Sequence, residues 1–125
     1  MNNRVVNLTP HAVRVLDDLN SPVIEFAPSG TVARLRESLT SGLTLRVHGV
    51  DCPAALVRYV DTVEGLPFSR PGVILLVSRV LAAAVVREDL YFPGGEVRAQ
   101  DGTIIGCRYL GRFTMVRSST EPRDA

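Results

Sequence analysis

The stretch from Val73 to Arg87 reads VILLVSRVLAAAVVR and predicts a buried strand that is followed directly by a helix. Its first five residues form a continuous apolar run, which is typical of a strand buried on both faces of a sheet. Ser78 follows this run and is a good N-cap residue for a helix. Residues 79–87 predict a helix with almost no polar surface, which should be packed on most sides. A buried strand that leads directly into an apolar helix predicts an α/β fold.

Patterns typical of strands lie on both sides of this unit. Leu43–His48 alternates apolar and polar residues, and Asp101-Gly102 is a strong hairpin signal. Ala54–Val63 fits a strand or a helix. We expect further strands at Arg4–Leu8, Thr31–Glu37, and in two hairpins, Ala12–Leu16 with Pro22–Phe26 and Glu96–Ala99 with Thr103–Leu110. We expect breaks or loops at Asp51-Cys52-Pro53, residues 64–72 and Pro93-Gly94-Gly95.

These elements predict a single α/β domain over residues 1–117, followed by a polar tail over residues 118–125. The domain should hold a mixed, mostly antiparallel sheet with the helix 79–87 packed on it. Because that helix is apolar nearly all round, we expect a homodimer that covers its outer side. The length of 125 residues fits one domain of this size.

The composition excludes several classes of protein. With 46% apolar and 22% charged residues, the chain is too apolar to be disordered. Cys52 and Cys107 are too far apart for a CxxC pair, and only two histidines are present, so we expect no metal, cofactor or disulfide. All 14 basic residues are arginine and 13 residues are acidic, so the chain should not bind duplex nucleic acid. The arginine bias fits either GC-rich codons or the recognition of an anion.

No targeting or membrane segment is predicted. The first residues lack a long apolar stretch behind a basic region, so they do not form a signal peptide. The most apolar stretch, Val73–Val86, is shorter than the roughly 20 residues that span a bilayer. We therefore expect a cytoplasmic protein without a membrane partner.

The first candidate site is the motif Asn7-Leu8-Thr9-Pro10-His11. It places three hydrogen-bonding side chains at the end of a strand, with a rigid proline among them. Histidine side chains in general titrate near neutral pH, so His11 is the candidate general acid or base. Alternatively, Asn7 and Thr9 satisfy the backbone of the turn, and His11 is a surface residue.

Two other places could bind a polar ligand. The junction of the buried strand and the helix exposes free N–H groups, so Ser78 and Arg79 could bind a phosphate there, although a plain N-cap also fits. Arg87-Glu88-Asp89 lies close to a glycine-rich loop, and either a polar ligand or a structural ion pair explains this cluster. Arg34 is a further candidate contact for an anion.

Several motifs together resemble a group of small proteins from actinobacteria and their phages. The motifs are Asn7–His11, Pro28–Arg34, Gly65-Leu66-Pro67, Val73–Ser78 and Arg87-Glu88-Asp89. The resemblance covers most of the chain in the same order, and it implies no mechanism. It implies that the shared pattern includes Asn7, Thr9, His11, Arg34, Ser78, Arg87 and Asp89. The layout also resembles, more weakly, the small viral ring nucleases that cleave cyclic oligoadenylate.

Two classes of function follow from these observations. In the first, the domain binds a nucleotide-like or other anionic small molecule through Asn7, Thr9, Ser78 and Arg79, with Arg34, Arg87 or Asp89 as further contacts. If this domain is also an enzyme, His11 would act as general acid or base in metal-independent cleavage of a cyclic oligonucleotide. In the second, the chain is a non-catalytic interaction protein, such as a phage accessory protein.

Overall fold

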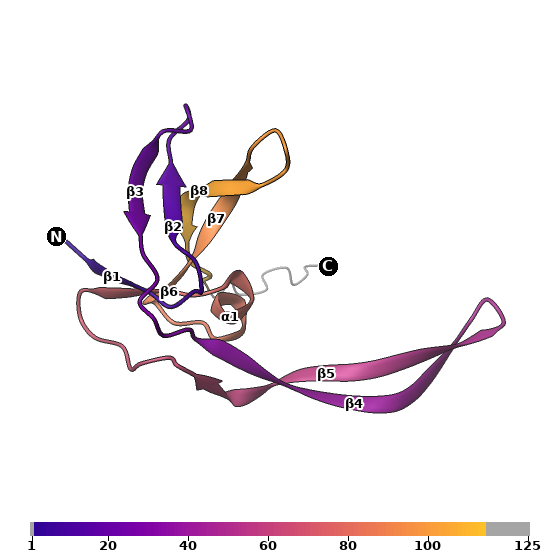
Figure 1. The fold of residues 1–125 in the computed structure, drawn as a ribbon. Coiled ribbons are helices and arrows are strands. Elements are labelled where there is room, and N and C mark those ends of the chain that lie inside the picture. The colour runs from indigo at the N-terminus through magenta and orange to yellow at the C-terminus, as the bar shows by residue number, and fades with distance from the viewer. Residues whose placement is uncertain (1, 115–125) are drawn as a thin grey trace, which may run out of the picture.

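A computed structural model describes residues 2–114, and for residues 59–62 it describes the backbone alone. Six strands form one sheet in the order β1-β6-β7-β8-β2-β3, and a separate two-stranded sheet, β4-β5, projects from it as a long arm (Figure 1). The elements are β1 (Arg4–Asn7), β2 (Val13–Leu16), β3 (Pro22–Phe26), β4 (Arg34–Val47), β5 (Val50–Glu64), β6 (Val73–Leu76), α1 (Arg79–Ala84), β7 (Leu90–Arg98) and β8 (Ile104–Gly111).

Strand β6 is buried as its apolar run predicts. It pairs in parallel with β1 on one side and with β7 on the other. Leu75, Leu76 and Val77 are at most 1% exposed. The connection from β6 to β7 runs through α1, so the strand–Ser–helix unit forms a parallel crossover. This confirms the buried strand and the helix that follows it.

The helix is shorter and more exposed than predicted. It ends at Ala84, and Val85 takes extended backbone angles of φ −120° and ψ 96°. The β-branched Val85 and Val86 lose side-chain freedom in a helix, and the chain must return for Leu90 to pair with Leu75. Only Leu81 and Ala82 of α1 are buried. With 54% strand and 6% helix, the fold consists of mixed sheets with one short helix packed on them.

The sheet pairings confirm the mixed character and both predicted hairpins, but the expectation of a mostly antiparallel sheet is wrong, because three of the five pairs in the six-stranded sheet are parallel. The antiparallel pairs are β2–β3, β7–β8 and β4–β5, and the parallel pairs are β1–β6, β6–β7 and β2–β8. The expected loop at Pro93-Gly94-Gly95 is wrong, because these residues lie inside β7. A Cβ atom on Gly94 would lie 2.1 Å from Cε1 of Tyr109, so a side chain there would displace the Tyr109 ring.

The two long strands of the arm, β4 and β5, contain several elements that the sequence pattern predicted as separate. The strands expected at 31–37 and 43–48 are one strand, β4, and the ambiguous segment 54–63 belongs to β5. The break expected at Asp51-Cys52-Pro53 is wrong, since these residues continue β5. The reversal lies at His48-Gly49 instead, where φ is +48° and +77°, as in a two-residue type I′ turn. The register shifts between Thr40 and Leu43, which marks a bulge around Gly42.

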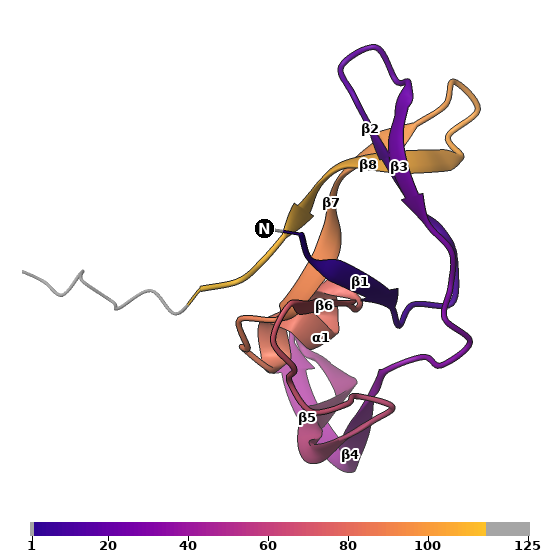
Figure 2. The ribbon, with the colours of Figure 1, turned by 90° about the vertical axis from the view of Figure 1, so that its left-hand side faces the viewer.

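The base of the arm is embedded in the core. Leu35 and Val63 pack against the cluster that contains Leu81, Leu75 and Phe92, and the two views place α1 between the sheet and the arm (Figures 1 and 2). The outer arm extends away from this core. The tail expected at 118–125, with the last residues of the expected domain, lies outside the described residues. No helix in residues 2–114 has the length and apolar character needed to cross a bilayer.

Candidate functional site

Asn7 is buried by the neighbouring chain segments and is 2% exposed. Its Nδ2 donates to the carbonyl oxygens of His11 at 2.8 Å and of Phe26 at 3.0 Å. Its Oδ1 accepts from the backbone N–H of Thr9 at 2.9 Å and from the Thr9 hydroxyl at 2.7 Å. Asn7 therefore fastens the 7–11 turn to the end of β3. Its amide is already engaged with the protein itself.

Thr9 and His11 lie on the outer side of this turn. The Thr9 hydroxyl also lies 3.0 Å from the carbonyl oxygen of His11, within hydrogen-bond distance. The His11 residue is exposed to solvent. This geometry agrees with the interpretation in which Asn7 and Thr9 satisfy the backbone of the turn. The role of His11 as general acid or base stays a prediction.

At the second candidate place, Ser78 caps α1. Its hydroxyl oxygen accepts from the backbone N–H of Leu81 at 3.2 Å. The guanidinium carbon of Arg79 lies 4.9 Å from the ring centre of Phe92 and 5.3 Å from that of Phe113. These two rings stack with their centres 4.9 Å apart. Ser78 therefore acts as the predicted N-cap, and Arg79 covers an aromatic pair.

The third candidate cluster forms a bidentate ion pair. Arg87 Nε and a terminal nitrogen donate to the two carboxylate oxygens of Asp89 at 2.9 and 2.6 Å. The same terminal nitrogen donates to the carbonyl oxygen of Pro67 at 3.1 Å. The Asp89 side chain is 9% exposed. The pair thus ties the loop after the arm to the crossover, which matches the alternative of a structural ion pair.

Three predicted residues share one hollow at the base of the arm. Thr9, Arg34 and Ser78 line a cavity of about 380 Å³ together with Leu8, Pro10, Val32, Ala33, Leu35, Glu37 and Val80. Among these lining residues Arg34 supplies the guanidinium group. Asn7, His11, Arg79, Arg87 and Asp89 are not among them, so the predicted site does not assemble as one pocket. Within residues 2–114, no cluster of three His, Cys, Asp or Glu side chains could hold a metal ion.

Among the described residues, two titratable groups have shifted pKa values, and neither Asp101 nor Cys107 lines this hollow. Burial raises the pKa of the Cys107 thiol above its ordinary value of 9.0. Hydrogen bonds from Thr103, first from its backbone N–H, lower the pKa of Asp101 in the turn between β7 and β8. Both shifts follow from the local fold, and neither group faces the residues of the predicted site.

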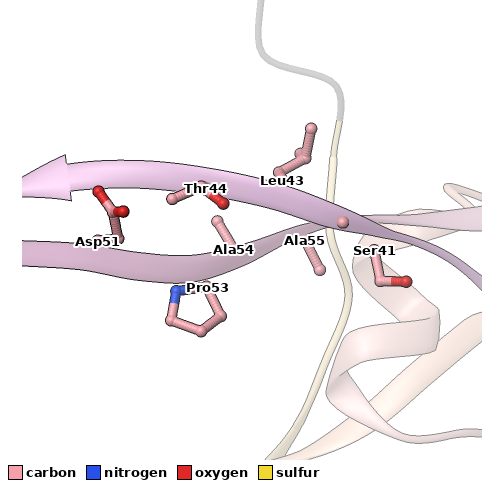
Figure 3. A pocket seen from close by; sticks show the side chains of 8 residues that line it. Ser41, Leu43, Thr44, Asp51, Pro53, Ala54 and Ala55 are labelled. Atoms are coloured by element: carbon pink, nitrogen blue, oxygen red, sulfur yellow. The ribbon is translucent and has the colours of Figure 1, made fainter.

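A larger hollow lies on the arm itself, where the bulge opens the ribbon. Its volume is about 530 Å³, and its lining includes Ser41, Gly42, Leu43, Asp51 and Pro53. Figure 3 shows that Leu43 and Ala54 point to one side of the arm, whereas Pro53 and Ala55 point to the other. The arm therefore has two distinct faces, as alternation along a strand requires.

One face of the outer arm is apolar and uncovered. We call it the apolar arm face, and the register places on it three cross-strand pairs and a neighbouring leucine: Leu43 and Ala54, Leu45 and Cys52, Val47 and Val50, with Leu56 beside them. The leucines and valines of this set are 40–64% exposed. The opposite face carries Thr44 and an ion pair of 2.7 Å between Arg46 and Asp51.

Sequence reasoning missed this face as a functional candidate. The alternation of Leu43, Leu45 and Val47 is visible in the sequence and predicts a half-buried strand. The same alternation continues through Val50, Cys52 and Ala54 once the turn is placed at His48-Gly49. Read together, the two runs predict an amphipathic hairpin. Only the structure shows that its apolar side faces solvent.

No family model matches the chain, and neither a curated protein nor a solved structure matches it.

Proposed function

We propose that this chain is a non-catalytic protein–protein interaction module that binds another polypeptide through the arm. The observation that carries the proposal is the apolar arm face, on which Leu45, Val50 and Leu56 are 57–64% exposed. Soluble monomers rarely leave contiguous apolar patches larger than a few hundred Å² uncovered, and such patches often mark binding surfaces. An isolated two-stranded hairpin is also marginally stable in water, so contact with a partner would stabilise the arm.

The internal hydrogen bonds of the predicted polar site residues also support an interaction module. A binding or catalytic site needs donors and acceptors that are free for a ligand. Asn7, Ser78 and Arg87 each bond to the protein's own backbone or side chains. These contacts give the residues a structural role that requires no ligand. The leucines and valines of the apolar arm face, in contrast, are exposed and bury little against the rest of the described residues.

The test compares two substitutions on adjacent residues of β4 with opposite orientation. Leu45→Asp places a charge on the apolar arm face, and Thr44→Asp places the same charge on the polar face. The tagged chain is crosslinked in the cells that express it. Wild type and Thr44→Asp should capture the same polypeptide. The amount that Leu45→Asp captures should be at least about 90% lower, because burying an unpaired charge in the contact is costly. Equal capture by all three chains, with equal melting temperatures, would contradict the proposal.

A second candidate is the binding of an anionic small molecule in the hollow at the base of the arm. The observation in its favour is that Thr9, Arg34 and Ser78 line that hollow together. A thermal-shift panel of mononucleotides, oligonucleotides and sugar phosphates tests it, since a ligand at 100 times its Kd adds about 2.7 kcal/mol of stability. The shift should disappear in Arg34→Gln and remain in Arg58→Gln, a change of an exposed arginine outside the hollow.

The same panel tests the enzyme alternative. If a cyclic oligonucleotide shifts the melting temperature and is cleaved, His11→Ala should abolish turnover and leave the thermal shift in place. Full activity in His11→Ala would remove this residue as the acid or base. The absence of a shift with every compound would exclude the ligand-binding candidate and leave the interaction module untouched.

A further inference from the structure

We propose that the polypeptide bound by the arm is a second copy of this chain, held face to face through the apolar arm face in a two-fold symmetric dimer. This inference rests on the proposed function and names its partner. It also moves the dimer contact from the outer side of α1, where the helix composition places it, to the arm. Two properties of the arm, its charge and its shape, argue for this occupant, and a third, its area, limits how tightly the two copies bind.

The first property is charge. The apolar arm face, from Leu43 and Ala54 to the turn, carries no charged side chain. On the other surfaces of the arm, Arg46 pairs with Asp51 at 2.7 Å and Arg36 with Glu64 at 3.4 Å. An acidic or basic partner would find no complementary charge on this face. Two copies, in contrast, can approach without repulsion, because the chain as a whole has a net charge of +1.

The second property is shape. Cross-strand pairs such as Leu45 with Cys52 and Val47 with Val50 make a regular, flat ribbon face. Two such ribbons pack face to face at about 10 Å in the sandwich arrangement of β-sheets. A two-fold axis places the same side chains on both sides of the contact, so each apolar residue meets an apolar residue. The ribbon edges remain free and do not disturb this packing.

The third property is area. The apolar arm face spans five residues of β4, Leu43–Val47, and seven residues of β5, Val50–Leu56, so its length is about 23 Å at about 3.3 Å per residue. With a width of about 10 Å, the two faces together bury on the order of 500–800 Å², depending on how far the side chains interdigitate. This is below the roughly 1,200 Å² of standard stable interfaces, so the dimer is of the weak and reversible kind. We expect a Kd on the order of tens of micromolar.

The chain carries its own reporter for this contact. Cys52 is exposed on the apolar arm face, and Cys107, the second cysteine, is buried. A thiol reagent therefore modifies Cys52 in the folded protein, and coverage of the arm face slows the reaction. The measurement needs no label and uses the full chain as it exists.

The experiment measures sedimentation velocity and the rate of Cys52 alkylation by iodoacetamide, at about 1 µM and at about 300 µM protein. A Kd of tens of micromolar leaves at least four-fifths of the chain monomeric at the lower concentration and about four-fifths dimeric at the higher one. For wild type and Thr44→Asp we expect a dimer at the higher concentration and alkylation at least about threefold slower there. Leu45→Asp should stay monomeric and show equal rates at both concentrations.

Each other outcome overturns the inference in a distinct way. If wild type is monomeric at both concentrations with equal alkylation rates, the partner is not a second copy. The proposed function then survives only if Thr44→Asp captures another polypeptide and Leu45→Asp does not. If a dimer forms that Leu45→Asp leaves intact and Val80→Asp disrupts, the contact lies on α1 and the arm is not the interface.

Discussion

At the scale of single residues, the predicted ligand-binding side chains mostly hold the chain together. Asn7 bonds to the carbonyl oxygen of Phe26, and Arg87 bonds to that of Pro67, partners 19 and 20 positions away. The sequence motif shows which donors and acceptors are present. It does not show which distant carbonyl groups they meet, because the fold brings those groups into place. For this reason, side chains that could have bound a ligand instead form hydrogen bonds within the protein.

The Asn7 clamp should be expensive to lose. In Asn7→Ala, the carbonyl oxygen of Phe26 and the N–H of Thr9 lose their partner, and the carbonyl oxygen of His11 keeps only the Thr9 hydroxyl. We expect the free energy of unfolding in urea to fall by about 2–4 kcal/mol, since each buried group left unsatisfied costs about 1–3 kcal/mol. The control Asn3→Ala changes an exposed asparagine and should alter stability by less than about 0.5 kcal/mol. A small effect of Asn7→Ala would show that the clamp is not needed for folding.

Cys107 predicts a dependence of stability on alkaline pH. Burial raises the pKa of its thiol, so the folded chain keeps the proton at a pH where the unfolded chain has lost it. The stability from this group is therefore present below the ordinary pKa of 9.0 and is lost as the pH rises from there through the folded pKa.

The check is urea unfolding at pH 7.5, 8.5 and 9.5. Wild type and Cys52→Ala should lose stability over this range, because Cys52 is exposed in the folded chain as it is in the unfolded one. Cys107→Ala should lose less stability with rising pH. Parallel curves for all three proteins would show that the buried thiol does not cause the loss.

At the scale of elements, the sequence pattern of a segment correctly predicted the strands, caps and turns that depend on that segment alone. The buried strand β6, the Ser78 cap and the two hairpins β2–β3 and β7–β8 are confirmed. The errors occurred where a residue that usually breaks a strand is accommodated by its neighbours. Pro53 continues β5 because each strand of a two-stranded ribbon is an edge, where a missing N–H is tolerated. Gly94 continues β7 because the ring of Tyr109 fills the space of its missing side chain.

The short helix α1 should depend on one anchor. Leu81 is fully buried in the cluster with Leu75 and Leu90, whereas Val80, its neighbour, is 53% exposed. We expect Leu81→Ala to lower the free energy of unfolding by about 2–5 kcal/mol, because it leaves a cavity in the core. Val80→Ala should change it by less than about 0.5 kcal/mol in dilute protein. Thermal and urea unfolding measure both; similar losses would mean that α1 packs differently.

At the scale of the whole molecule, the chain divides its apolar surface between a buried core and an uncovered arm. The core gathers β6, α1, β7 and the base of the arm around Leu75, Leu81 and Phe92. Leu45 and Leu56 of the outer arm are exposed to solvent, and Figure 1 shows that the arm extends away from the core. No described residue of the outer arm belongs to the core cluster. The outer arm is therefore available to bind a partner.

An arm dimer predicts a weak response to salt. The contact is apolar and the net charge of the chain is +1, so screening has little to change. Between 50 and 500 mM NaCl, the Kd from sedimentation velocity should change by less than about threefold. Sodium sulfate should tighten the dimer, since it strengthens the burial of apolar surface. A tenfold weakening in NaCl would indicate that ion pairs hold the copies together.

Local features could be predicted from the amino-acid sequence: the buried strand from Val73, the helix cap at Ser78, the reversal at Asp101-Gly102 and the alternation of Leu43, Leu45 and Val47. Each depends on propensity, spacing and polarity within a few residues, which the sequence carries directly. The internal hydrogen bonds of the polar groups and the exposure of one apolar face followed from the tertiary fold. Those outcomes depend on contacts between distant segments, and the free energy of burial is settled by the assembled core rather than by any one stretch of the chain.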